Sequence, residues 1–153
     1  MIARDLKSKL VNKKARIGVI GLGYVGLPLI EAFNDKGFDT LGCDIDPGRV
    51  KGLNAGRSPI KIIADSRVKA MVSSGRLVAT TDFARLKTCD AIIVCVPTPL
   101  TRHREPDISY VVETGRTIAR HLRRGQLVVL ESPTYPGTTI EDLRPVLEAS
   151  GLK

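Results

Sequence analysis

Aromatic residues are scarce in this chain, at 4% of 153 residues, and tryptophan is absent. Proteins that bind single-stranded DNA or RNA stack the bases on aromatic side chains, so this scarcity argues against nucleic acid as the partner. The formal net charge of +8 then fits either solubilising surface charge or attraction of anionic nucleotides.

Residues that build disulfide frameworks and zinc sites are equally few. The three cysteines show no C-x-x-C spacing, and the two histidines are isolated, so neither kind of site is expected. Cys43 and Cys95 lie in apolar runs, where a free cysteine is usually a small buried side chain.

Long apolar segments are absent as well. No run approaches the ~20 residues that a membrane-spanning helix needs, and the basic N-terminal stretch lacks the apolar centre of a secretory signal. We therefore expect a cytoplasmic protein that does not bind membranes. No G-x-x-x-x-G-K-[ST] motif occurs, which excludes a P-loop that binds a triphosphate for hydrolysis.

Short β-branched runs instead alternate with longer amphipathic ones. Strands are expected at 16–20, 38–44, 77–80, 90–96 and 126–132. Helices are expected at 24–36, 47–53, 65–73, 108–123 and 139–149, with a short helix capped by Thr81 or Asp82. This order predicts an α/β Rossmann-type fold, a doubly wound parallel sheet with helices on both faces. We assign 1–15 to an N-terminal basic helix and 16–153 to the dinucleotide-binding domain, truncated before its last strand.

The sequence G-L-G-Y-V-G at 21–26 is the central motif. It follows a predicted strand and opens a predicted helix, which is the context of a dinucleotide-binding turn. Gly21 permits the tight turn, Gly23 lets a pyrophosphate approach the backbone, and Gly26 allows close packing of the helix. The competing interpretation is a tight turn without a ligand.

Asp44 ends the next predicted strand, 18 residues after Gly26. A carboxylate there accepts hydrogen bonds from ribose hydroxyls and repels a 2′-phosphate, which favours NAD over NADP. Arg49 lies five residues further on and weakens that preference.

Two later loops are expected at the same edge of the sheet. In this fold the first and fourth strands lie side by side, so Val96, Pro97 and Thr98 should lie near the middle of the cofactor. The loop that begins at Ser132 should approach the nicotinamide end. Simple alternatives are a rigid proline turn for the first loop and helix capping by Thr138 or Thr139 for the second.

Six runs carry a family resemblance: GLGYVGLPL (21–29), CDID (43–46), TTDF (80–83), CVPTPL (95–100), EPDISYV (105–111) and LESPTYPGTT (130–139). In this order and spacing they resemble the N-terminal NAD-binding domain of the UDP-glucose/GDP-mannose dehydrogenase family, with the UDP-N-acetylhexosamine 6-dehydrogenases as the nearest branch. The resemblance implies that the cofactor-binding residues are Gly21, Gly23, Tyr24, Val25, Gly26, Asp44, Arg49, Val96, Pro97, Thr98 and Ser132.

The resemblance also implies a reaction. Members of this family oxidise the C6 hydroxyl of a nucleotide sugar to a carboxylate with two NAD, for surface polysaccharide synthesis. The expected substrate is a UDP-sugar bound through later domains, and the full-length protein is expected to be a homo-oligomer. Two alternatives remain: a β-hydroxyacid-type NAD dehydrogenase and a dinucleotide-binding module without chemistry.

The chain departs from the family pattern in two ways. Pro133 stands where the family has a functional threonine, and a pyrrolidine offers neither a hydroxyl nor an N–H. The family's catalytic cysteine, lysine and glutamate are expected beyond Lys153, so no catalytic residue is predicted within the chain. This part alone is expected to bind NAD without turning over a sugar.

Overall fold

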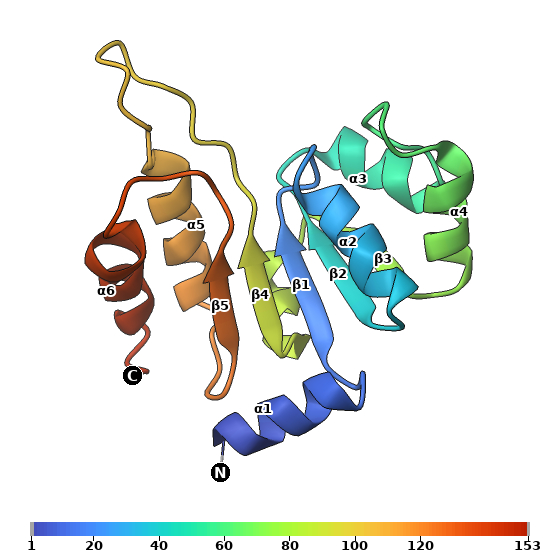
Figure 1. Cartoon of the computed structure of the whole chain (residues 1–153), viewed down its shortest axis with the longest axis horizontal. Helices are drawn as coiled ribbons and strands as arrows, with labels where there is room; N and C mark the ends of the chain where they lie inside the picture. The colour runs from blue at the N-terminus through green and yellow to red at the C-terminus, as the bar shows by residue number, and fades with distance from the viewer. Residues whose placement is uncertain (1, 153) are drawn as a thin grey trace.

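The computed structural model describes residues 2–152 and contains a five-stranded parallel sheet with the strand order β3-β2-β1-β4-β5 (Figure 1). Helices cover both faces, so the predicted doubly wound α/β fold is confirmed. Met1 and Lys153, the ends of the expected helix and domain, lie outside the described residues.

All five predicted strands form where apolar, β-branched runs occur. Their bounds are β1 (Arg16–Ile20), β2 (Asp39–Cys43), β3 (Leu77–Thr80), β4 (Ala91–Val94) and β5 (Leu127–Leu130). β1 pairs with β2 on one side and β4 on the other, so the strand order reverses at β1, as predicted. The carboxyl ends of β1, β2 and β4 therefore meet at one edge of the sheet.

The helices largely follow the predicted pattern. They are α1 (Ile2–Val11), α2 (Gly26–Asp35), α3 (Pro47–Asn54), α4 (Asp65–Ser73), η1 (Phe83–Thr88), α5 (Ser109–Ala119), η2 (Thr139–Leu143) and α6 (Arg144–Glu148). Asp82 is the residue that caps η1, accepting a 3.0 Å hydrogen bond from the N–H of Ala84. None of the helices in residues 2–152 is long and apolar enough to cross a membrane.

Two helix predictions differ from the structure. The expected helix 139–149 is divided into a π-helical turn, η2, and the short α6. Pro145 explains the division, because it has no N–H to continue the regular helical bonding to residue 141. The expected helix 108–123 ends at Ala119, four residues before Arg123, whose side chain bonds to another part of the chain.

Two apolar cores flank the sheet. On one face, α2, α3 and α4 bury Leu27, Leu53 and Val68 against the strands. On the other face, η1 and α5 bury Leu86 and Ile118. Each such fully buried aliphatic side chain contributes about 1.5–3 kcal/mol to stability. These cores fix the strands and therefore the loops at their ends.

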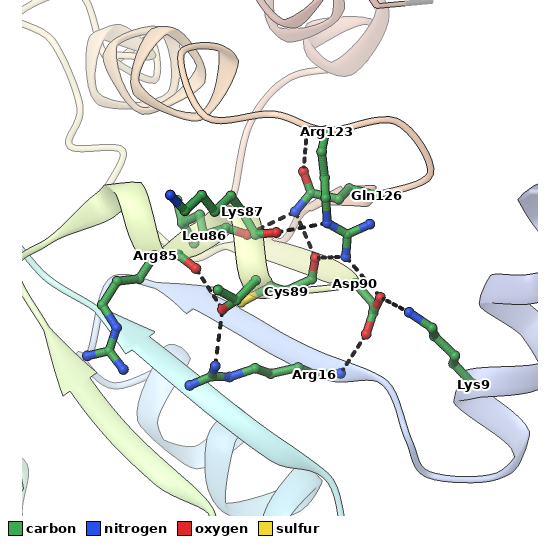
Figure 2. Close-up of polar contacts among 10 residues, drawn as sticks. Lys9, Arg16, Arg85, Leu86, Lys87, Cys89, Asp90, Arg123 and Gln126 are labelled. Carbon is green, nitrogen blue, oxygen red and sulfur yellow. Dashed lines mark hydrogen bonds and ion pairs between the residues drawn. The ribbon is translucent and has the colours of Figure 1, made fainter.

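At the amino end of the sheet, the carboxylate of Asp90 joins three separate segments (Figure 2). It accepts hydrogen bonds from Lys9 Nζ at 2.7 Å, from Arg123 Nη2 at 2.9 Å and from the backbone N–H of Arg16 at 3.0 Å. Burial by itself raises the pKa of Asp90, but these bonds outweigh it and hold the pKa below its ordinary value. Lys9 thereby fastens α1 to the sheet.

Gln126 completes this amino-end cluster (Figure 2). Its Nε2 donates to the carbonyl oxygens of Leu86 and Cys89, at 2.9 and 2.7 Å. Its Oε1 accepts from the N–H of Arg123 at 2.7 Å, so the turn before β5 is tied to the turn before β4. At the amino end of the sheet, these polar side chains are thus hydrogen-bonded to other parts of the chain.

Candidate functional site

The turn between β1 and α2 contains two glycines that the fold itself requires. Gly21 has a φ of +93°, and a Cβ there would lie 2.4 Å from the carbonyl oxygen of Cys95. A Cβ on Gly26 would lie 1.8 Å from the carbonyl oxygen of Gly21. A side chain at either position would therefore force the backbone apart.

Gly23 is different, because a Cβ built on it meets no atom within 4 Å. The fold alone gives no reason for a glycine at this position. The open space beside its backbone fits the predicted close approach of a pyrophosphate.

The start of α2 supports an anion at this turn. Its N-cap residue is Val25, which has no side-chain group to accept the first helical N–H groups. By contrast, α3 begins with Asp46, whose carboxylate accepts from the N–H groups of Gly48 and Arg49. N–H groups and a helix dipole without a side-chain cap attract a negative charge. Tyr24 and Val25 lie exposed beside this helix start.

Asp44 lies next to the glycine turn and is only 6% exposed. Its Oδ2 accepts from the N–H of Leu22 at 2.9 Å, and its Oδ1 accepts from the N–H of Asp46 at 3.0 Å. The Arg49 guanidinium donates to Oδ2 at 3.0 Å. The structure therefore brings together the predicted turn, the acid and the arginine.

The loops after β4 and β5 are bonded to each other at the same edge. Thr98 Oγ1 donates to the carbonyl oxygen of Pro133 at 2.6 Å. Ser132 is buried, and its Oγ donates to the carbonyl oxygen of Val96 at 2.7 Å. The predicted residues of both loops, including Pro97, are thus adjacent, and two of their hydroxyl protons are used in joining the loops.

Helix capping by Thr138 or Thr139 was the simple alternative for the second loop, and the structure shows it to be wrong. Thr138 makes no cap bond, and its Oγ1 donates instead to the carbonyl oxygen of Tyr135 at 2.8 Å. The Tyr135 hydroxyl donates to Asp142 at 2.9 Å, and this bond raises the pKa of Tyr135. These side chains shape the loop rather than the helix start.

The three cysteines are free. Burial raises the pKa of Cys43 to about 12 and that of Cys95 to about 11, and it also raises the pKa of Cys89. Cys43 is buried as predicted, whereas Cys95 is only half-buried because it lies just past the end of β4. None is a nucleophilic thiolate at neutral pH. Within residues 2–152 no group of His, Cys, Asp and Glu side chains could hold a metal ion.

Ile45 is a candidate contact that the sequence analysis missed. It is 81% exposed although it lies between Asp44 and Asp46, directly after a buried strand. This exposed aliphatic side chain beside Asp44 offers an apolar surface to a planar ring. The signal in the sequence is an isoleucine outside any periodic run.

Comparison with known proteins agrees with this geometry. A model of the UDP-glucose/GDP-mannose dehydrogenase family, NAD binding domain, matches residues 15–153. UDP-N-acetyl-D-glucosamine 6-dehydrogenase of Pseudomonas aeruginosa is 38% identical over 142 residues, which are 92% of this chain and 33% of that protein. UDP-N-acetyl-D-mannosamine dehydrogenase of Pyrococcus horikoshii is 40% identical over 139 residues, 90% of this chain and 33% of that protein.

A solved structure shows the same likeness in three dimensions. A ternary complex of GDP-mannose dehydrogenase from Pseudomonas aeruginosa superimposes with a TM-score of 0.84 at 29% identity, covering 88% of this chain and 32% of that one. The present chain therefore spans about a third of the length of the curated relatives it matches.

Proposed function

The chain belongs to the UDP-glucose/GDP-mannose dehydrogenase family, and on that premise we propose that it is the NAD-binding part of a UDP-sugar 6-dehydrogenase. The proposed reaction oxidises the C6 hydroxyl of a UDP-N-acetylhexosamine to a carboxylate, as a step toward a surface polysaccharide. The names of the two relatives support this substrate class. The observation that carries the proposal is the uncapped start of α2 beside Gly23, with Asp44 at the end of the next strand.

Each part of the site has a distinct task in this proposal. The backbone N–H groups of the 21–26 turn, the N–H of Gly26 at the start of α2 and the dipole of that helix would hold the diphosphate of NAD. Asp44 accepts hydrogen bonds from the adenosine ribose, and Ile45 lies against the adenine. The loops joined by Thr98 and Ser132 limit the space at the nicotinamide end. NAD, when bound, accepts the hydride that leaves the sugar carbon.

Pro133 sets a limit on what this end of the site contributes. Where the family resemblance implies a threonine hydroxyl, Pro133 supplies a carbonyl oxygen that already accepts from Thr98. No proton donor is offered by that side chain to a substrate oxygen or a water molecule. The three thiols also stay protonated. We therefore propose that the residues of this site bind and orient NAD without catalysing turnover.

The remaining assignments are part of the same proposal. We assign 16–153 to the dinucleotide-binding domain and 1–15 to a basic N-terminal segment, whose helix α1 (Ile2–Val11) is fastened to the domain by Lys9. The free thiols fit a cytoplasmic location, where reducing conditions maintain them. The UDP-sugar is bound by further domains, and the full-length protein is a homo-oligomer that binds neither nucleic acid nor membranes.

Calorimetric titration with NAD tests the proposal at Gly23. Alanine there leaves the fold unchanged, since its Cβ meets nothing, but places a methyl group where the pyrophosphate must approach. We expect NAD affinity to fall at least about tenfold while the melting temperature stays the same. Gly52→Ala in α3, where a Cβ also meets nothing, is the matched control and should bind NAD normally. Equal NAD binding by the Gly23→Ala variant would contradict the proposed site.

A further inference from the structure

A pocket at the amino end of the sheet, which we call the amino-end pocket, lies between α1 and the turn before β5. Its volume is about 360 Å³. The charged side chains that line it are Asp5 and Lys9 of α1, Asp90 before β4, and Arg123 and Arg124 of the turn. The candidate NAD site lies at the opposite, carboxyl edge of the sheet, so the two sites are separate. The match to the family begins at residue 15, so the wall formed by α1 lies outside the matched residues.

Asp90 contributes little negative charge to this pocket. It is 7% exposed, and its carboxylate is already paired with Lys9 Nζ at 2.7 Å and with Arg123 Nη2 at 2.9 Å. The charge of this carboxylate is therefore largely neutralised within the chain. Arg124 adds a further positive charge to the lining, and α1 carries other cations beside it. The pocket therefore presents a positive potential to a small anion.

The cations of the pocket retain N–H donors for a ligand. Lys9 uses one of the three N–H groups of its ammonium in the bond to Asp90. Arg123 donates from Nε and Nη2 to other parts of the chain, whereas its Nη1 has no acceptor within residues 2–152. In the same described range, the exposed guanidinium of Arg124 has neither a hydrogen bond nor an ion pair. Charged N–H donors of this kind form strong hydrogen bonds with phosphate oxygens.

The turn that carries the two arginines is held by its own hydrogen bonds. Gly125 has a φ of +89°, and the N–H of Gln126 donates to the carbonyl oxygen of Arg123 at 3.4 Å. The Gln126 side chain also bonds the N–H of Arg123, at 2.7 Å. Figure 2 shows the side chains of Lys9 and Arg123 converging on Asp90 from α1 and from this turn. Because these groups are positioned before a ligand arrives, binding has little of the chain left to order.

We propose that the amino-end pocket binds a small molecule through a dianionic phosphate group, supplied by a phosphate ester or by inorganic phosphate. The phosphate oxygens accept from Lys9 Nζ, from Arg123 Nη1 and from the Arg124 guanidinium, while Asp90 keeps the first two cations in place. The volume of about 360 Å³ leaves room for the organic part of an ester. NAD has no phosphate monoester, and each phosphate of its diphosphate carries a single negative charge, so NAD is not the ligand of this pocket.

Amide NMR titration of the chain with glucose 6-phosphate, at about pH 7.5 and constant ionic strength, tests the inference. The phosphate is a dianion at this pH, since its second pKa is about 6. We expect saturable shifts at residues 123–126. Arg124→Gln should lower the affinity about fivefold, because one charged donor is lost. Asp5→Asn should raise it about twofold, because a negative charge leaves the lining.

Titration with inorganic phosphate distinguishes the two sources of the ligand group. Tighter binding of glucose 6-phosphate would identify an ester as the ligand, because its organic part then adds contacts within the pocket. Equal affinities for the two probes would identify the phosphate ion alone as the ligand.

Arg102→Gln is the matched control, because it removes one exposed arginine from the loop after β4 and none from the pocket. It should change the affinity by less than about 1.5-fold. Equal losses in Arg102→Gln and Arg124→Gln would show only a general attraction to a basic chain, and the inference would be wrong. Shifts confined to the 21–26 turn, or no saturable shift at 123–126 in the folded chain, would also overturn it. Neither result would affect the proposed NAD site, which is tested by titration with NAD.

Discussion

Two buried aspartates, at opposite ends of the same sheet, are held in different ways. Asp90, at the amino end, accepts from residues 81, 74 and 33 positions away in the sequence. Asp44, at the carboxyl end, accepts from residues 22, 5 and 2 positions away. Asp90 thus cross-links distant segments (Figure 2), whereas Asp44 joins the 21–26 turn to the loop that follows β2.

In the proposed function, the difference separates a carboxylate that only joins parts of the fold from one that also binds a ligand. Asp90 has two cationic partners and a backbone donor, and removing it leaves α1, β1 and the turn before β5 without their common acceptor. Asp44 has a single cationic partner, Arg49, whose side chain is 37% exposed. In the proposed function, a ribose hydroxyl competes with the bond from the partly exposed Arg49.

The largest expected effect is on stability at the amino end. Asp90→Ala should lower the free energy of unfolding by about 2–3 kcal/mol, because a half-buried backbone N–H and two cations lose their common acceptor. Asp44→Ala should cost about 1–2 kcal/mol, because the buried N–H of Leu22 loses its acceptor while Arg49 and the N–H of Asp46 reach water. Urea unfolding measures both. Equal losses in the two variants would remove the distinction between the two ends.

A second effect is the pH dependence of stability. The pKa of Asp90 is lowered in the folded state, so its contribution is fully present above the unfolded pKa of about 4. That contribution is lost as the pH falls through the lower folded value. Asp90→Asn should therefore flatten the acid limb of a stability curve recorded from about pH 6 to pH 2. An unchanged acid limb in this variant would show that the amino-end cluster contributes little.

A smaller effect is expected where the two loops join at the carboxyl end. Ser132→Ala should lower stability by about 1 kcal/mol, since it leaves the carbonyl oxygen of Val96 without its buried donor. Thr98→Val should cost less, because its bond to Pro133 is exposed. Thermal melting of both variants measures the order. A larger loss in Thr98→Val would mean that the exposed bond is the main link.

The smallest expected effect is on the thiols. With the pKa of Cys43 at about 12 and that of Cys95 at about 11, the folded chain should resist alkylation at pH 8 for hours. Labelling should appear in urea at the midpoint of unfolding. Rapid labelling of Cys95 in the native chain, followed by mass spectrometry, would show that its half-buried position leaves the thiol reactive.

The features that depend on neighbouring residues could be predicted from the sequence. Apolar runs located the five strands, and the glycine spacing located the turn, because both depend on neighbouring residues. The Asp90 cluster escaped prediction, since Lys9, Arg16 and Arg123 are joined only when the strands align. The split of the last helix was missed although Pro145 signals it.

The candidate site divides in the same way. Its turn and acid were recognised from spacing alone, whereas the bonds of Arg49 to Asp44 and of Thr98 to Pro133 depend on side-chain directions. Ile45 was missed because an isolated apolar residue after a strand has no periodic pattern. These two bonds and the position of Ile45 depend on which loops meet at the carboxyl edge of the sheet.

Amide NMR shifts on addition of NAD would show whether NAD binds at the carboxyl end of the sheet and not at the amino end. We expect shifts confined to the carboxyl end of the sheet, at residues 21–26, 44–49 and 96–98. The amides of Asp90, Arg123 and Gln126 should stay unchanged. Shifts centred on that amino-end cluster, with the 21–26 turn unaffected, would show that NAD does not bind at the carboxyl end.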